Sequence, residues 1–101
     1  TGILVNDYES TSMPDKVSLD QNYPNPFNPS TSIRFYVETI SNTSLELFDI
    51  NGKLVDTLVD KMTIPGEYNI VWDGSAYSSG IYIARLNSGS KSKSVKMLLL
   101  K

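Results

Sequence analysis

Two of the side chains most often used in catalysis, histidine and cysteine, do not occur in this chain of 101 residues. Serines are plentiful, but the chain contains no histidine to activate one of them and no G-x-S-x-G nucleophile elbow. It also contains no cysteine, which excludes disulfides, thiolate nucleophiles and zinc thiolate sites. Carboxylates could pair for glycoside hydrolysis, but most fall in expected turns or on polar strand faces, where solvation accounts for them. We therefore predict that this domain is not an enzyme and needs no cofactor.

A calcium loop could begin at Asp49-Ile50-Asn51-Gly52. Such a loop needs further oxygen ligands and a bidentate glutamate, and Lys53-Leu54-Val55 supply none. Asn-Gly between two apolar runs is instead the strongest short-range signal for a β-hairpin, because both residues tolerate a positive φ. We therefore predict a turn at Asn51-Gly52 and no metal site.

Charge is distributed unevenly along the chain. Residues 1–73 carry all 11 acidic side chains and four basic ones, a net charge of −7, whereas residues 74–101 carry five basic side chains and no acid, a net charge of +5. The overall charge of −2 argues against nucleic-acid binding, which usually needs a basic domain. The acid-free end of the chain can matter for a protein partner.

The segment Lys91–Leu100 has the pattern of a terminal β-strand with apolar residues on both faces. Odd positions can face the core and even positions point the other way, namely Val95, Met97 and Leu99 against Lys96, Leu98 and Leu100. One interpretation is a buried last strand whose lysines prevent edge pairing. The other is a docking handle, in which a partner pairs with the edge and takes Leu98 and Leu100 into pockets. An exposed edge could also pair with a second copy of the chain.

Short β-type runs divided by turn residues fill the chain from Val17 onward, without a helical period of ten residues free of Gly and Pro. About seven strands at this spacing predict an all-β fold, an immunoglobulin-like antiparallel β-sandwich. Residues 17–101 are the expected domain, and residues 1–16 an expected linker in which Ile3-Leu4-Val5 form a short strand or the end of a preceding domain. We expect most of the core to consist of Ile33, Phe35, Val37, Leu45, Leu47, Tyr68, Ile70, Trp72, Tyr82, Leu86, Val95, Met97 and Leu99.

Asn22–Ser30 is the least usual stretch, because three of its residues are prolines, which fix φ and restrict the residues before them. Tyr23 and Phe27 are expected to be its apolar anchors, and its asparagine side chains can bond the backbone. The segment is either a rigid recognition loop or a stiff crossover packed on the edge of the sandwich.

The stretch Asn22–Ser30, which we call the proline loop, and the terminal strand together resemble a known family. Residues 19–31, L-x-Q-N-Y-P-N-P-F-N-P-S-T, closely resemble the opening of the type A C-terminal sorting domain of the type IX (Por) secretion system. The similarity continues in order through Leu47–Lys53, Gly66, Val71–Gly74, Ser79–Tyr82 and Lys96–Lys101. The Pro-Asn-Pro-Phe-Asn-Pro run is specific, whereas Trp-Asp-Gly and Gly-x-Tyr also occur in the related immunoglobulin-like domain of flagellar hook-capping proteins. The family often has Tyr at Phe48 and Leu at Asn51, differences that leave the expected fold unchanged.

The resemblance implies a domain that does no chemistry and marks an upstream cargo domain for passage through the outer membrane. The cargo would be in the periplasm in transit and then at the cell surface or outside the cell. The implied partners are the type IX machinery, with an outer-membrane receptor or shuttle, and a sortase-like peptidase that cuts within Thr1–Lys16 and removes the domain. The residues expected to be recognised are Lys96, Met97, Leu98, Leu99, Leu100, Lys101, Pro24, Asn25, Pro26, Phe27, Pro29, Gly80 and Tyr82.

Two other functions stay open on the sequence. An accessory carbohydrate-binding module of a secreted enzyme would need aromatic side chains lined up on an outer face, and Tyr36 and Tyr77 are the candidates. Trp72 could also stack on a sugar, but its strand parity with Tyr68 and Ile70 predicts a core position. The remaining alternative is a structural spacer.

Overall fold

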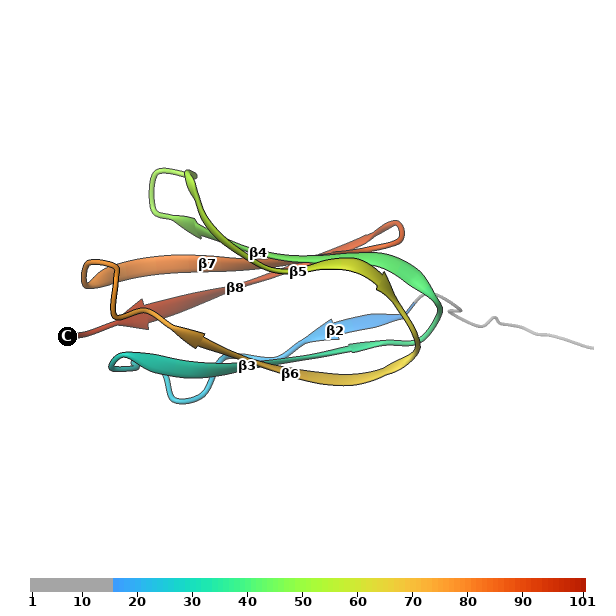
Figure 1. The fold of residues 1–101 in the computed structure, drawn as a ribbon, viewed down its shortest axis with the longest axis horizontal. Helices are drawn as coiled ribbons and strands as arrows, with labels where there is room; N and C mark the ends of the chain where they lie inside the picture. Colours follow the sequence, from blue (N-terminus) through green and yellow to red (C-terminus); the bar gives the residue numbers. More distant parts are fainter. Residues whose placement is uncertain (1–15) are drawn as a thin grey trace, which may run out of the picture.

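The computed structural model describes residues 16–101, which form a sandwich of two antiparallel sheets (Figure 1). Its seven strands in this range are β2 (Val17–Leu19), β3 (Ser30–Val37), β4 (Ser41–Asp49), β5 (Leu54–Thr63), β6 (Gly66–Asp73), β7 (Gly80–Ser88) and β8 (Lys91–Leu99). The predicted all-β, immunoglobulin-like antiparallel sandwich is confirmed. The linker expected over residues 1–16, with the strand at Ile3-Leu4-Val5, lies outside the described residues apart from Lys16. Within residues 16–101, no helix is long and apolar enough to cross a membrane.

The two sheets differ in size and in the strands that border them. One sheet has the order β2-β3-β6 and the other the order β5-β4-β7-β8. The hairpins β4–β5 and β7–β8 lie within the larger sheet, whereas the chain changes sheets between β3 and β4, between β5 and β6, and between β6 and β7 (Figure 1). The last strand, β8, is therefore an edge strand of the larger sheet.

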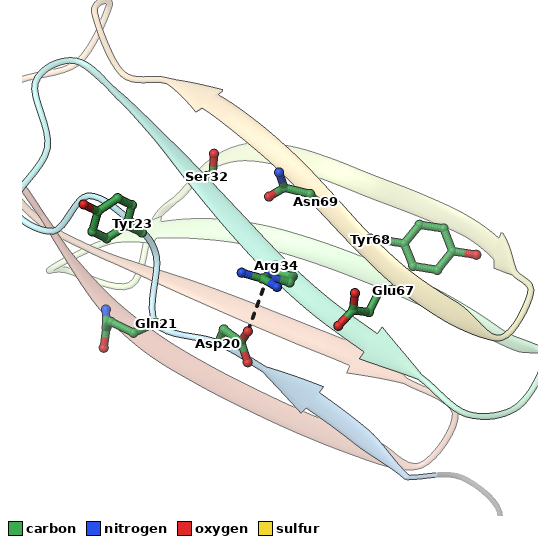
Figure 2. A pocket seen from close by; sticks show the side chains of 8 residues that line it. All are labelled: Asp20, Gln21, Tyr23, Ser32, Arg34, Glu67, Tyr68 and Asn69. Atoms are coloured by element: carbon green, nitrogen blue, oxygen red, sulfur yellow. Dashed lines mark ion pairs between the residues drawn. The ribbon is translucent and has the colours of Figure 1, made fainter.

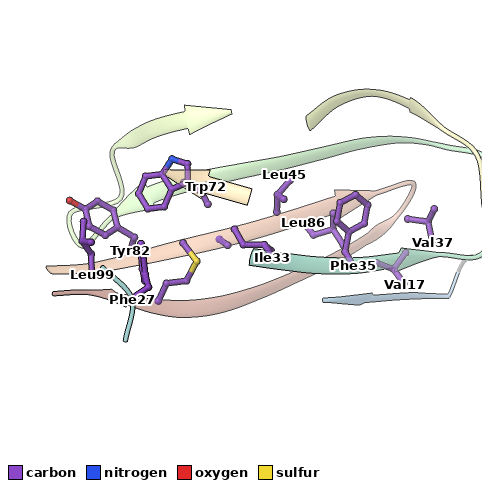
Figure 3. Close-up of a cluster of buried hydrophobic side chains, with 13 residues drawn as sticks. Val17, Phe27, Ile33, Phe35, Val37, Leu45, Trp72, Tyr82, Leu86 and Leu99 are labelled. Carbon is purple, nitrogen blue, oxygen red and sulfur yellow. The ribbon is translucent and has the colours of Figure 1, made fainter. Parts of the chain in front are cut away.

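The core lies between the two sheets, where strand alternation directs the apolar side chains (Figure 3). Most of the expected core residues are buried there: Ile33, Phe35, Val37, Leu45, Leu47, Trp72, Tyr82, Leu86, Met97 and Leu99. Three others, Tyr68, Ile70 and Val95, pack against the core but are only partly buried. They lie on the edge strands β6 and β8, which have a neighbouring strand on one side only. Sequence analysis left three buried residues out of the core, Val17, Phe27 and Ala84.

Four aromatic rings fill the end of the core near the C-terminus. The ring centroid of Trp72 lies 5.8 Å from that of Phe27, 5.3 Å from that of Tyr77 and 5.6 Å from that of Tyr82. The indole Nε1 donates a hydrogen bond of 3.0 Å to the Asp56 carboxylate, so the buried polar atom has a partner. The core position predicted for Trp72 is confirmed.

Tyr77 belongs to this aromatic cluster and not to an outer face. It packs against the core, and its hydroxyl donates to the carbonyl of Val55 at 2.9 Å. Tyr36 lies on β3, in the other sheet. Tyr77 therefore does not supply the outer-face aromatic side chain that the alternative function, a carbohydrate-binding module, would need.

The connection between β4 and β5 is organised by Asp49. Its Oδ1 accepts hydrogen bonds from the backbone N–H groups of Asn51 at 2.9 Å and Lys53 at 3.0 Å. The predicted turn is present, with Gly52 at a φ of 83°. The connection between the two strands has four residues, 50–53, and the N–H of Asp49 donates to the carbonyl of Lys53 across it at 2.9 Å. The carboxylate of Asp49 therefore closes the turn. Among residues 16–101, no group of three or more acidic side chains is placed to bind a metal ion.

Asp49→Ala should lower the free energy of unfolding by about 1 kcal/mol, which is the usual net contribution of an intramolecular hydrogen bond to stability. Asp49→Asn keeps an oxygen acceptor at the same place and should lose clearly less. Urea unfolding followed by Trp72 fluorescence measures both. Equal losses in the two variants would show that the charge of Asp49, rather than its hydrogen bonds, holds the turn.

Candidate functional site

The terminal strand β8 presents two different faces at its end. Met97 and Leu99 are buried in the core, as expected for odd positions. Leu98 is half-buried and Leu100 is 50% exposed on the opposite side. The strand therefore keeps apolar surface outside the core, which the sequence pattern predicts.

The outer edge of this strand is covered at its C-terminal end by the proline loop. Phe27 forms a parallel bridge with Leu99. In this bridge the N–H of Phe27 donates to the carbonyl of Leu98 at 2.9 Å, and the N–H of Leu100 donates to the carbonyl of Phe27 at 3.0 Å. Asn25 Oδ1 accepts from the N–H of Leu98 at 3.0 Å. The Gln21 side chain also donates to the carbonyl of Lys96 at 2.6 Å. The interpretation in which a partner pairs with this edge is therefore wrong for the fold as it stands, because the loop occupies the edge.

The proline loop is held from inside by Phe27 and by two polar residues. Phe27 is only 2% exposed and lies in the aromatic cluster. The buried Asn22 side chain donates to the Thr31 hydroxyl at 2.9 Å and to the carbonyl of Pro24 at 3.1 Å. The peptide bonds before Pro24, Pro26 and Pro29 are cis. Tyr23, in contrast, is 81% exposed, so its expected role as an apolar anchor is wrong.

The corner Gly80–Tyr82 contacts the same end of β8. Gly80 pairs with Leu99 and Tyr82 pairs with Met97 in the ladder between β7 and β8. Gly80 has a φ of 155°, a conformation that residues with a side chain rarely adopt. Tyr82 donates to the carbonyl of Ser78 at 2.7 Å, four residues upstream, which fixes the start of β7.

Lys101 ties the end of the chain to the segment between β6 and β7. Its Nζ donates to the carbonyls of Ser75 at 2.7 Å and Tyr77 at 2.9 Å, and its N–H donates to the Ser79 hydroxyl at 2.9 Å. Hydrogen bonds from Ser75 lower the pKa of Asp73 in this segment, and the Lys101 charge adds to the effect. The sequence gives no signal for these contacts, because most of the acceptors are backbone carbonyls.

The three segments named by sequence analysis thus meet at one end of the sandwich, where the chain ends (Figure 1). We call the surface that they form, Lys96–Lys101 with Pro24–Pro29 and Gly80–Tyr82, the C-terminal surface. Sequence analysis missed Gln21, which joins two of these segments. The sequence signals for it are its position directly before the proline loop and its place in the motif of residues 19–31.

Tyr82 gives this end of the fold a predicted pH dependence. Burial raises the pKa of the Tyr82 phenol, and the charges of Asp49 and Tyr77 add to the effect. A raised pKa means that the fold favours the neutral phenol, so its contribution to stability is complete below about pH 10 and is lost as the pH rises above that value.

Tyr82→Phe removes this titration, so the loss of stability between about pH 9 and pH 11 should become smaller than in the unmodified chain. At neutral pH the variant should be less stable by about 1 kcal/mol, because the bond to Ser78 is lost. Thermal unfolding across this pH range measures both effects. An identical alkaline loss in the two chains would contradict the assignment to Tyr82.

A polar groove of about 440 Å³ lies on the three-stranded sheet (Figure 2). Arg34 and Asp20 form an ion pair of 3.6 Å there, and both side chains are more than half exposed. Glu67 and Asn69 of β6 line the groove beside them, and Tyr23 lies at its rim (Figure 2). The groove is open to solvent, where an ion pair contributes little.

A protein-family model described as the secretion system C-terminal sorting domain matches residues 21–101. Two solved structures from Porphyromonas gingivalis have a similar fold. The dimeric latent PorU matches with a TM-score of 0.68 and 23% identity over 94% of this chain and 10% of PorU. PorZ, described as an essential bacterial surface component of the type IX secretion system, matches with a TM-score of 0.53 and 22% identity over 84% of this chain and 11% of PorZ. The chain therefore spans about a tenth of either protein. No curated protein sequence matches it.

Proposed function

Because this chain belongs to the family of secretion system C-terminal sorting domains, we propose that the type IX machinery recognises it through the C-terminal surface. The family gives the general role: the domain is a C-terminal sorting signal of type IX secretion and is not itself catalytic. The signal directs export to the cell surface or the extracellular space. What remains to be assigned is which residues are read and by which partner.

The observation that carries the proposal is that three segments distant in sequence are joined into one surface. Hydrogen bonds connect Phe27 and Asn25 to Leu98, and Lys101 to the segment before Gly80. Leu100 is half exposed on this surface although it is apolar. Leu98 beside it is also only partly buried, so the joined segments leave apolar side chains accessible to a partner at this end of the sandwich.

The partners that we propose are an outer-membrane receptor or shuttle, which binds the domain in the periplasm, and a sortase-like peptidase at the cell surface. The peptidase would cut in residues 1–16, between the cargo domain and the sorting domain, because an extended segment can enter a protease cleft. Any enzymatic activity of the whole protein would then belong to the cargo domain. Self-association through a strand edge stays a prediction, and the loop that covers the end of β8 keeps Leu98 and Leu100 out of such pairing.

The experiment that tests the function uses a reporter protein fused to the N-terminus of the whole chain in a bacterium with a type IX system. We expect the reporter at the cell surface or in the medium, and we expect it in the periplasm when the system is inactivated. Reporter without the chain is the control. Equal surface delivery with and without the chain would contradict the sorting function.

A further inference from the structure

The outer, solvent-facing side of the four-stranded sheet is apolar at five positions, which we call the outer patch: Phe48, Leu54, Ile81, Ile83 and Leu98. In β4, β7 and β8 the buried residues alternate with these positions, so the patch points away from the core. Antiparallel sheets with one solvated face normally carry polar residues there. The fold itself does not explain the outer patch.

The strand register makes the outer patch continuous. Phe48 pairs with Leu54 on one side and with Ile83 on the other. Ile81, two residues before Ile83 on the same face, pairs with Leu98. Leu54 is 47% exposed, Ile81 is 38% exposed and the other three are half-buried. The five side chains therefore form a flat row that crosses all four strands.

Cations border the outer patch. Lys96 is paired directly with Ile83. The guanidinium carbon of Arg85 lies 4.9 Å from the ring centroid of Phe48, a cation–π contact. Lys53 is exposed and precedes Leu54 in the chain.

None of these cations forms an ion pair with a carboxylate among residues 16–101. The only ion pair within residues 16–101 joins Arg34 to Asp20 on the other sheet. Glu46 is paired with Arg85 in the strand register but forms no ion pair in the described part of the chain. The patch is therefore apolar in its centre and positive at its border.

We propose that the outer patch is the docking face for a protein of the type IX machinery that presents an apolar ridge flanked by carboxylates, an inference that rests on the proposed function. The charge at the border favours an acidic partner and opposes a second copy of this chain, which would bring the same cations into contact. No patch residue is more than half exposed, and a flat surface suits a protein better than insertion into a bilayer. Because the proline loop covers the edge of β8 beside Leu98, a partner approaches this part of the strand by its face.

The test uses the same reporter fusion to the whole chain and two kinds of variant. Ile81→Thr with Ile83→Thr removes apolar surface and keeps β-branched side chains, and Lys96→Glu reverses the charge at the border. We expect each to reduce export about tenfold or more, the effect of losing central contacts in an interface. Thermal unfolding of the purified chains should show that both variants fold.

Matched controls lie elsewhere on the same molecule. Val71→Thr makes the same kind of chemical change at an exposed position of β6 in the other sheet. Lys93→Glu reverses a charge on β8 at an odd position, on the face opposite Lys96. Both controls should be exported like the unmodified chain. Normal export of the patch variants, or an equal loss in the controls, would overturn the proposal.

Three further outcomes have separate meanings. If the unmodified chain does not export the reporter, the proposed function fails, and the patch inference fails with it. If sedimentation shows a dimer that the patch variants abolish, the occupant is a second copy, and the proposal of an acidic partner is overturned. The same holds if the chain binds protein-free vesicles of phosphatidylcholine and phosphatidylglycerol through the patch, since the occupant would then be a lipid surface.

Discussion

Phe27→Ala should lower the free energy of unfolding by about 3–5 kcal/mol, the usual cost of truncating a buried phenylalanine to alanine. Phe27 is the only buried aromatic side chain that the proline loop contributes, and its ring contacts Trp72 with a centroid distance of 5.8 Å. Its backbone also holds Leu98 and Leu100 at the edge of β8. Truncation therefore leaves a cavity beneath the loop and weakens the joint between the loop and the terminal strand.

Tyr23→Ala is the matched control for this prediction. Tyr23 lies in the same loop but is 81% exposed, so its truncation should change the free energy of unfolding by no more than about 0.5 kcal/mol. Chemical unfolding followed by circular dichroism compares the two variants. A small loss for Phe27→Ala, similar to that of the control, would mean that the loop does not depend on its buried anchor.

Deletion of Val95–Lys101 should abolish surface delivery of a reporter fused to the N-terminus of the chain. The deletion removes the proposed recognition strand, and it also removes Met97 and Leu99 from the core. Each buried side chain of this kind contributes about 2–5 kcal/mol, and a whole domain has about 5–15 kcal/mol of stability. We therefore expect an unfolded domain and a reporter retained in the periplasm.

Removal of Lys101 alone separates recognition from folding. This change leaves the buried core side chains in place and removes the hydrogen bonds of Lys101 to the carbonyls of Ser75 and Tyr77 and to the Ser79 hydroxyl. The chain should stay folded, and export should fall less than in the larger deletion. Normal surface delivery after deletion of Val95–Lys101 would show that the signal lies elsewhere in the chain.

The sandwich and most of its core could be predicted from the sequence because strand alternation is a local property. Ile33, Phe35 and Val37 alternate with polar neighbours, and the structure buries all three. Phe27 could not be placed in the core in this way, since it lies in a loop without a strand period. Tyr68 and Ile70 have the correct parity, but their strand borders a sheet and leaves them partly exposed.

The covering of the β8 edge could not be predicted, because it depends on contacts between residues far apart in sequence. Gln21, Asn25 and Phe27 all bond the backbone of β8, more than 70 residues away. The apolar pattern of Met97–Leu100 correctly indicates surface outside the core, but it does not show whether the edge is free. The outer patch likewise requires the register, which brings Phe48 of β4 beside Ile83 of β7.

The most direct test of recognition through this end of the domain is site-specific cross-linking during export. A photo-reactive residue is introduced at Leu98, and in a matched chain at Val71 on the opposite sheet, each in a fusion with an exported reporter. We predict a light-dependent adduct between position 98 and a type IX protein, and none from position 71. Adducts from position 71 alone, or none from position 98 while export continues, would contradict the account.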